Sequence, residues 1–265
     1  MYGKQAQPTH SLADAQKFIA ELNEEAKHHR AIHHPYLQKL ICGDLPDPKA
    51  SLKDFFFQYL AYSVDFMRYL MATMSQLDDR KYREKLMGNL MEESGRVDPE
   101  DASKLAEIGV QLEWVQGVPH PDLFKRFLRA IDINESYLDK NDFCDDAKIW
   151  RKMFLNVCTS GGGAQALGAM GIGTENIVKY IYLQILEAIK VHLKVSPKDR
   201  VFFDLHALLD DEHGEILDNI AVEYARYERN RPDLRNGMLM ALNLRASFFD
   251  AMMSRAENLE WRKTG

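Results

Sequence analysis

Several features are scarce in this sequence, and each scarcity excludes a class of protein. The three cysteines, Cys42, Cys144 and Cys158, form no CxxC pair, so a disulfide framework is not expected. No apolar run reaches the roughly 20 residues that cross a bilayer, and residues 1–14 contain no apolar signal core. The sequence therefore predicts a cytoplasmic protein that has no membrane partner.

The sequence also has no excess of basic over acidic residues. The chain carries 34 Lys+Arg against 40 Asp+Glu, a formal net charge of −6, whereas a general nucleic-acid binder needs a basic face. Glycine and proline counts are ordinary, which excludes collagen-like and low-complexity chains. With 265 residues, the chain is long enough to bury a substantial core.

What is present is a 3.6-residue apolar period along almost the whole chain, without any convincing period-two alternation. The pattern predicts one all-α domain over residues 1–265, with no internal repeat or flexible linker. The expected helices span about 11–29, 35–41, 51–75, 79–93, 120–131, 143–158, 162–192, 197–226 and 232–257. A turn with two prolines separates the second from the third, and an excursion fills the stretch between Glu93 and His120.

An aromatic stripe marks the predicted helix 51–75. Its members are spaced 4, 3, 4 and 3 residues apart and share one helical face. They are Phe55, Tyr59, Tyr62, Phe66 and Tyr69. A core-facing stripe is the simpler interpretation, and a pocket wall is the alternative. For Tyr59, Tyr62 and Tyr180 two roles are open. They line a pocket or take part in redox chemistry, or they only pack in the core.

The most informative segment contains His206, Asp210 and His213, at positions i, i+4 and i+7. On one helix these side chains share a face over two turns. Two imidazoles and a carboxylate suit a first-row transition metal. A solvated polar face is the alternative, because further acidic residues lie in the same segment.

A metal core between helices also needs carboxylates from other helices. Glu92 and Glu93 end the helix 79–93, and only one of them can face the core; we favour Glu93, with Glu92 as the alternative. Glu175 is the other candidate. It ends a stripe of small residues formed by Gly161, Ala164, Gly168 and Gly171. Glycines cost a helix roughly 1 kcal/mol each, so either close packing or an open cavity has to explain them. We hypothesise that the stripe leaves room for substrate beside the metal.

Together these features resemble the haem-oxygenase-like di-iron oxidases, the iron-containing redox enzyme family. That family shares its fold with haem oxygenase, thiaminase II (TenA) and the pyrroloquinoline-quinone synthase PqqC. The likeness runs from about His34 to Met252, through HHPYLQKLICGDL, NLMEESG, HPDLFKRFL, HALLDDEH and RNGMLMALNLRASFFDAMM.

The resemblance implies an up-and-down bundle of about seven or eight helices, two iron ions and O2 as cosubstrate. The implied metal ligands are Glu93 (or Glu92), His120, Glu175, His206, Asp210 and His213. His120 enters at the start of an H-x-x-L-F helix, and a surface histidine is the alternative. The loop before it is longer than expected for the family. If this loop displaces His120, the first iron site loses a ligand.

The implied activity is that of an iron-dependent oxidoreductase. It would use O2 for N-oxygenation, desaturation or C–C cleavage of a small metabolite, namely an amino acid, an amine or a fatty acid. No protein acid or base is assigned, because the oxidised metal centre would activate the substrate. The fold group favours a homodimer, and the chemistry admits an external reductant.

Three alternatives remain open at the level of sequence. A metal-free, thiaminase-like enzyme would use Cys158 as nucleophile, although buried free cysteines are usually inert. A non-catalytic interaction module would use an all-α docking face. The histidines at positions 28, 29, 33 and 34 form either a second metal or haem site or a polar helix end.

Three basic residues could bind a carboxylate group of a substrate. They are Arg68, Arg151 and Lys179.

Overall fold

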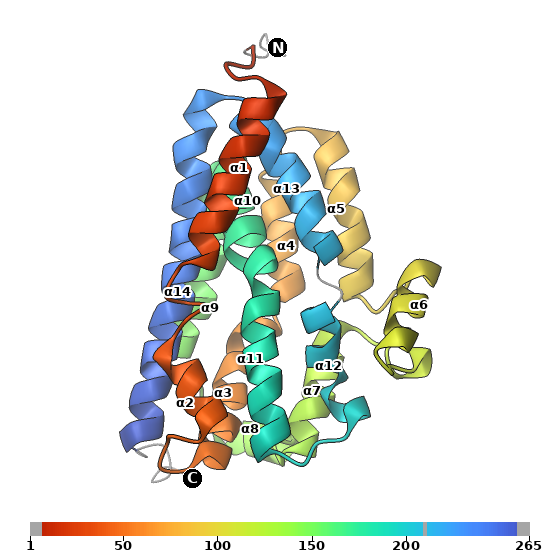
Figure 1. Ribbon diagram of the computed structural model, residues 1–265, viewed down its shortest axis with the longest axis vertical. Helices are drawn as coiled ribbons and strands as arrows, with labels where there is room; N and C mark the ends of the chain where they lie inside the picture. The colour runs from red at the N-terminus through yellow and green to blue at the C-terminus, as the bar shows by residue number, and fades with distance from the viewer. Residues whose placement is uncertain (1–6, 209–210, 259–265) are drawn as a thin grey trace.

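The computed structural model describes residues 7–208 and 211–258, apart from the side chains of residues 100, 208 and 211–213. Within that part of the chain the regular elements are all helical, and most helices run along the long axis of an elongated bundle (Figure 1). No described helix is both long and apolar enough to cross a membrane. The predicted all-α class is confirmed.

The α-helices follow one another in chain order. They are α1 (Leu12–Lys27), α2 (Pro35–Cys42), α3 (Pro48–Ser63), α4 (Phe66–Ser75), α5 (Arg80–Glu93), α6 (Pro99–Glu107), α7 (His120–Ala130), α8 (Glu135–Lys140), α9 (Asp145–Ser160), α10 (Gly162–Leu167), α11 (Asn176–His192), α12 (Pro197–Leu208), α13 (Asp211–Ala225) and α14 (Arg231–Asn258). Single turns of 3-10 helix lie at Leu112–Trp114 and Glu228–Asn230, and an eight-residue π-helix lies at Gly168–Glu175.

Local sequence signals explain several helix ends. Ser11 caps α1, and its hydroxyl and the Asp14 carboxylate form the reciprocal capping box. Gly43 ends α2 with a φ of 72°, a conformation that glycine adopts without strain. Asp47 then caps α3, with Pro48 at the first helical position.

The predicted single helix over 51–75 is wrong, because the chain breaks between α3 and α4 at Val64 and Asp65. The aromatic spacing continues across this break, so periodicity alone could not reveal it. The Asp65 carboxylate accepts a hydrogen bond of 2.7 Å from Arg151 on α9, a partner 86 residues away. A tertiary contact therefore accompanies the end of the helix.

The segment 162–192 is helical throughout, as predicted, with a π-helical turn at Gly168–Glu175 inside it. Gly168 and Gly173 of this segment lie against α14, and Gly171 lies against Leu217 of α13. A Cβ atom at Gly168 would come within 1.9 Å of the Leu234 carbonyl oxygen, and one at Gly237 within 1.9 Å of the Gln165 carbonyl oxygen. Close packing explains the small residues, and the hypothesis that they leave room for substrate is wrong.

Two helices, α12 and α13, are described where the sequence predicted one helix over 197–226. Residues 209–210 lie outside the description, so the common face expected for His206, Asp210 and His213 stays a prediction. The short helices α6 and α8 were not predicted.

Candidate metal centre

Three potential metal ligands converge between helices. Glu93 is the last residue of α5, His120 is the first residue of α7, and His206 lies in α12. Their ligand atoms lie within 4.8 Å of one another. Only 2% of Glu93 and 8% of His206 is exposed to solvent, and His120 is half-buried. The glutamate of this cluster is Glu93 rather than its neighbour Glu92.

The long segment between Glu93 and His120 leaves the helical bundle and returns to it at nearly the same point, because Gly95 lies beside Gly117 and Val118. The Gly117 amide donates a hydrogen bond of 2.7 Å to the Gly95 carbonyl oxygen. Gly95 has a φ of 95° and lies against Val118, where a Cβ atom would come within 2.6 Å of the Val118 backbone. In Figure 1 the intervening α6 projects to the side of the bundle. The insertion therefore does not carry His120 away from Glu93.

The imidazole contacts in the cluster suit metal binding. His120 Nδ1 lies 3.0 Å from Glu93 Oε1, but among the described residues it has no partner aligned for a hydrogen bond. His206 Nδ1 donates to the Phe202 carbonyl oxygen at 2.7 Å, which leaves the lone pair of a neutral ring on Nε2. Metal-binding histidines commonly donate their other ring N–H to a carbonyl in this way. This donor set fits a transition-metal ion such as iron.

Glu175 is the fourth predicted ligand that the structure brings to this place. It ends the π-helical turn, is buried, and lines the same cavity as Glu93, His120 and His206. Asp210 and the side chain of His213 lie outside the described residues. Four of the six predicted ligands are thus together, and the complete ligand set stays a prediction.

The inner cavity beside these residues is small and mostly aromatic. Its volume is about 30 Å³, room for roughly two water molecules. The remaining lining residues are Tyr59, Tyr62, Ser63, Phe66, Pro121, Phe124, Thr174, Val178, Tyr182, Phe202 and Arg245. Part of the aromatic stripe therefore walls the cavity, while Phe55 and Tyr69 are buried in the core.

Sequence reasoning missed two members of this cavity. The Tyr182 hydroxyl hydrogen-bonds to that of Tyr59 at 2.8 Å, and Arg245 is a buried cation. The only available signal for Arg245 was a single charge inside an otherwise apolar stretch of α14. Of the basic residues singled out instead, Arg68 and Arg151 both pair with Asp65.

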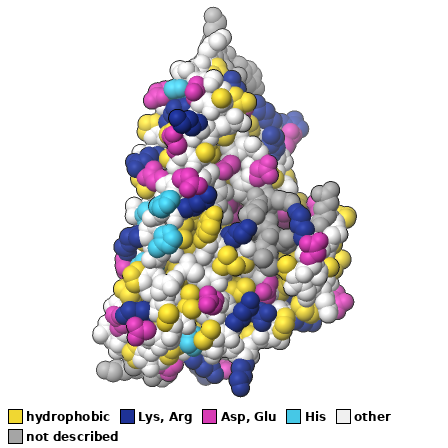
Figure 2. All heavy atoms as spheres, viewed as in Figure 1, with side chains coloured by type: hydrophobic (Ala, Val, Ile, Leu, Met, Phe, Trp, Pro, Cys, Tyr) yellow, Lys and Arg dark blue, Asp and Glu magenta, His cyan; other side chains and the backbone are white. Residues whose placement is uncertain are grey.

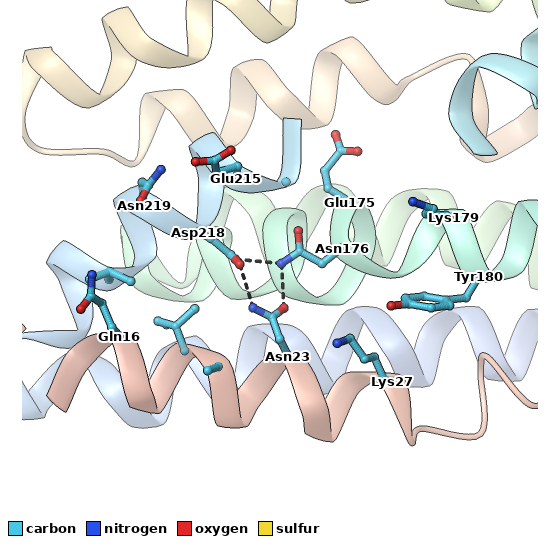
Figure 3. A pocket seen from close by; sticks show the side chains of 14 residues that line it. Gln16, Asn23, Lys27, Glu175, Asn176, Lys179, Tyr180, Glu215, Asp218 and Asn219 are labelled. Atoms are coloured by element: carbon cyan, nitrogen blue, oxygen red, sulfur yellow. Dashed lines mark hydrogen bonds between the residues drawn. The ribbon is translucent and has the colours of Figure 1, made fainter. Parts of the chain in front are cut away.

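A second, polar pocket of about 470 Å³ adjoins the inner cavity, and Glu175 lines both. In Figure 3, Lys27, Lys179 and Tyr180 lie at one end, and Glu215 and Asn219 lie toward the other. We call this the outer pocket.

A half-buried carboxylate, that of Asp218, lies in the acidic part of the outer pocket. Asp218 accepts hydrogen bonds from Asn23 and Asn176 at 2.7 and 2.8 Å (Figure 3). Burial raises the pKa of Asp218, and the two amide donors lower it in part.

Histidine side chains gather on the face shown in Figure 2, and the four histidines that follow α1 in the chain all make local contacts. His28 and His33 bond to backbone carbonyl oxygens, and His29 accepts from the Ala31 amide. His34 caps α2 and contacts Asp250. These contacts favour the polar helix-end interpretation over a second metal or haem site. The same figure shows acidic and basic side chains interspersed over this face.

Comparison with known proteins gives three results. The model of a family described as iron-containing redox enzymes matches residues 53–246. A 4-aminobenzoate synthase from Chlamydia muridarum is 24% identical over 198 residues, 74% of each chain. A 4-aminobenzoate synthase from Chlamydia pneumoniae is 22% identical over 74% of this chain and 78% of its own length.

Solved structures share the fold. A CADD-like protein of unknown function from Nostoc punctiforme has a TM-score of 0.73 and 13% identity, covering 92% of this chain and 99% of its own. A haem-oxygenase-like domain of unknown function from Shewanella denitrificans has a TM-score of 0.68 and 16% identity over 97% of each chain. A TenA homologue from Pseudomonas syringae scores 0.67 at 13% identity, covering 95% of this chain and all of its own. The expected haem-oxygenase-like fold is confirmed.

Proposed function

Because the chain belongs to the iron-containing redox enzyme family, we propose that it is a non-haem di-iron oxidase that uses O2 to oxidise a small metabolite. The observation that carries this proposal is the buried cluster of Glu93, His120 and His206. Carboxylates and imidazoles from several helices are the ligands that di-iron proteins of helical folds use.

In this proposal Glu93, His120 and His206 hold one ion. Glu175, with Asp210 and His213, completes the place for the second. When bound, a pair of ferrous ions supplies electrons for the reduction of O2 and oxidising power toward the substrate. An oxidation that takes fewer electrons from the substrate than O2 accepts also needs an external reductant.

The side chains around the centre have three tasks. The Glu93 and Glu175 carboxylates offset the charge of the cations. The hydrogen bond from His206 to Phe202 fixes the orientation and tautomer of the ring. Aromatic side chains such as Phe124 exclude bulk water from the cavity, which strengthens electrostatic interactions inside it.

The outer pocket supports an amine-bearing or amino-acid substrate over a fatty acid. It is polar, and it places ammonium groups and carboxylates around a space of about 470 Å³. The relatives named 4-aminobenzoate synthases are named for a product with an amine and a carboxylate on one small molecule. N-oxygenation, desaturation and C–C cleavage all remain outcomes for such a substrate.

A metal-free enzyme is the second candidate, because TenA homologues share the fold. Its nucleophile would be Cys158, which is completely buried. Burial raises the pKa of this thiol to about 12, so hardly any thiolate forms near neutral pH. This observation favours the di-iron proposal.

Iron binding and O2 consumption test the proposal with a matched pair of neighbouring residues. After anaerobic loading with Fe(II), wild type and Glu92→Gln should each retain about two iron ions per chain and consume O2. Glu93→Gln and His206→Ala should lose at least one ion and most of the O2 consumption, because each removes a ligand from the cluster. Iron quantification and an oxygen electrode provide the measurements. A wild-type protein that retains no iron would falsify the proposal.

A further inference from the structure

Arg245, near the middle of α14, is a buried cation without an anionic partner in the described part of the chain. Only 2% of it is exposed, and it lines the inner cavity together with Glu93, His120, Glu175 and His206. Among the described residues its Nε and Nη1 atoms have no hydrogen-bond partner, and its one side-chain hydrogen-bonding contact is with the neutral hydroxyl of Tyr59. Arginine is almost never fully buried unless it is paired.

Aromatic rings hold the guanidinium in place but do not accept hydrogen bonds from its Nε and Nη1 atoms. Its central carbon lies 5.6 Å from the centre of the Tyr62 ring and 5.2 Å from that of Trp150. These two rings are stacked, with centroids 4.0 Å apart and planes 7° apart. Such contacts favour the charge and restrict the side chain, but each N–H still needs an acceptor.

Two hydroxyl groups of the same cavity also lack a well-aligned hydrogen-bond partner among the described residues. Ser63 Oγ is buried without a hydrogen-bond partner among the described residues, and buried Tyr62 Oη has only a poorly aligned contact with the Thr174 side chain. The inner cavity therefore contains a cation and two neutral donors whose hydrogen-bonding capacity is incompletely used. Buried polar groups without partners are costly, so such a cluster indicates a ligand that supplies acceptors.

We propose that Arg245, Tyr62 and Ser63 bind the carboxylate group of a small-molecule ligand in the inner cavity. The planar guanidinium matches a carboxylate in geometry and in charge. The volume of about 30 Å³ fits the three heavy atoms of this group and little more. That the ligand is the substrate rests on the proposed function, which places the oxidising centre in the same cavity.

The charges of the residues that line the cavity support a negatively charged ligand. Glu93 and Glu175 also line it, but in the proposed function their charge is offset by the metal ions. The charge of Arg245 then still needs an anion. The rest of the ligand extends toward the outer pocket, since Glu175 borders both spaces.

Binding of acetate, with acetamide as its neutral analogue, tests the proposal. The full chain is titrated both loaded with Fe(II) without oxygen and after chelation, so that binding to the metal is separated from binding to Arg245. Acetate should bind saturably to the wild type, and Arg245→Met should weaken binding about 10- to 100-fold. Calorimetry and tryptophan fluorescence, with Trp150 beside the guanidinium, give the readout.

Arg255→Met is the matched control. This residue lies on the same helix, but it is paired with Asp54 through hydrogen bonds of 2.7 and 2.8 Å. It should bind acetate as the wild type does. Tyr62→Phe and Ser63→Ala each remove only a hydroxyl, and each should weaken binding a few-fold even if Arg245→Met does not fold.

Two results would overturn the proposal: no saturable acetate binding to the wild type, or equal affinities in the wild type and in the folded Arg245, Tyr62 and Ser63 variants. Tight binding of acetamide would show that the donors do not select an anion and would also overturn it. Failure of the wild type to retain iron, with acetate binding intact, would count against the di-iron function alone.

Discussion

Single side chains define the centre through what they contact. Glu93 and Glu92 are adjacent in sequence, yet only Glu93 reaches the cluster because neighbours on a helix point about 100° apart. The carboxylate of Glu93 and the Nδ1 atom of His120 lie 3.0 Å apart. Two electron-rich atoms this close are an arrangement that a cation between or beside them stabilises.

Cys158 is completely buried, and its burial makes the thiol unreactive. We expect iodoacetamide to label exposed Cys42 in the native protein, and to label it faster at about pH 9 than at about pH 7, because the thiolate is the reactive form. Cys158 should stay unlabelled at both values, since its pKa is raised to about 12 and it is therefore still protonated at about pH 9. Peptide mass spectrometry measures the labelling.

Denaturation supplies the control, because all three cysteines should then react. Rapid labelling of Cys158 in the native protein at about pH 7 would contradict this prediction, and it would revive the thiaminase-like alternative.

At the scale of elements, the small-residue segment 161–175 serves helix packing. It lies against α14, the helix that also carries Arg245, and it ends at Glu175. A close approach of two backbones at this place fixes the Glu175 carboxylate, a candidate metal ligand, relative to Arg245 in the inner cavity.

Gly168→Ala should therefore destabilise the protein by about 2 kcal/mol or more, because the new Cβ would lie 1.9 Å from a backbone carbonyl that cannot move cheaply. Gly88→Ala is the control. It lies inside α5 with nothing within 4 Å of its Cβ position, and it should stabilise the protein by about 1 kcal/mol. Thermal or urea unfolding measures both. Equal stability of the two variants would show that the backbones do not meet as closely as described.

At the scale of the whole molecule, the centre joins distant parts of the chain. Its described members come from α5, α7, α12 and the turn before α11. An ion bound at this place connects these elements, and a ligand that binds only the folded state stabilises it by mass action.

Ferrous iron should consequently raise the melting temperature of the wild type. The expected increase is about 5–10 °C at a free concentration of about 100 times Kd. Glu93→Gln should show less than half of this increase, and Glu92→Gln should match the wild type. Differential scanning fluorimetry under nitrogen, with and without a chelator, gives the measurement. An increase of the same size in Glu93→Gln would mean that the ion binds elsewhere.

The helical class and most helix positions follow from local signals, and residue type and spacing make Glu93, Glu175 and His206 candidate ligands. The 3.6-residue period places the apolar faces, and caps such as Ser11 and Gly43 place the ends. The family resemblance then connects Glu93, His120, Glu175 and His206, which lie far apart in the chain.

The sequence by itself thus determined the fold class and the chemical types of the candidate ligands, because periodicity and residue identity are local properties. The tertiary structure alone decided three further matters. It ended a helix at Asp65, it used the glycines for packing against α14, and it buried Arg245 among aromatic rings. Each of these depends on a residue far away in the chain, and no local pattern records which distant residues will meet.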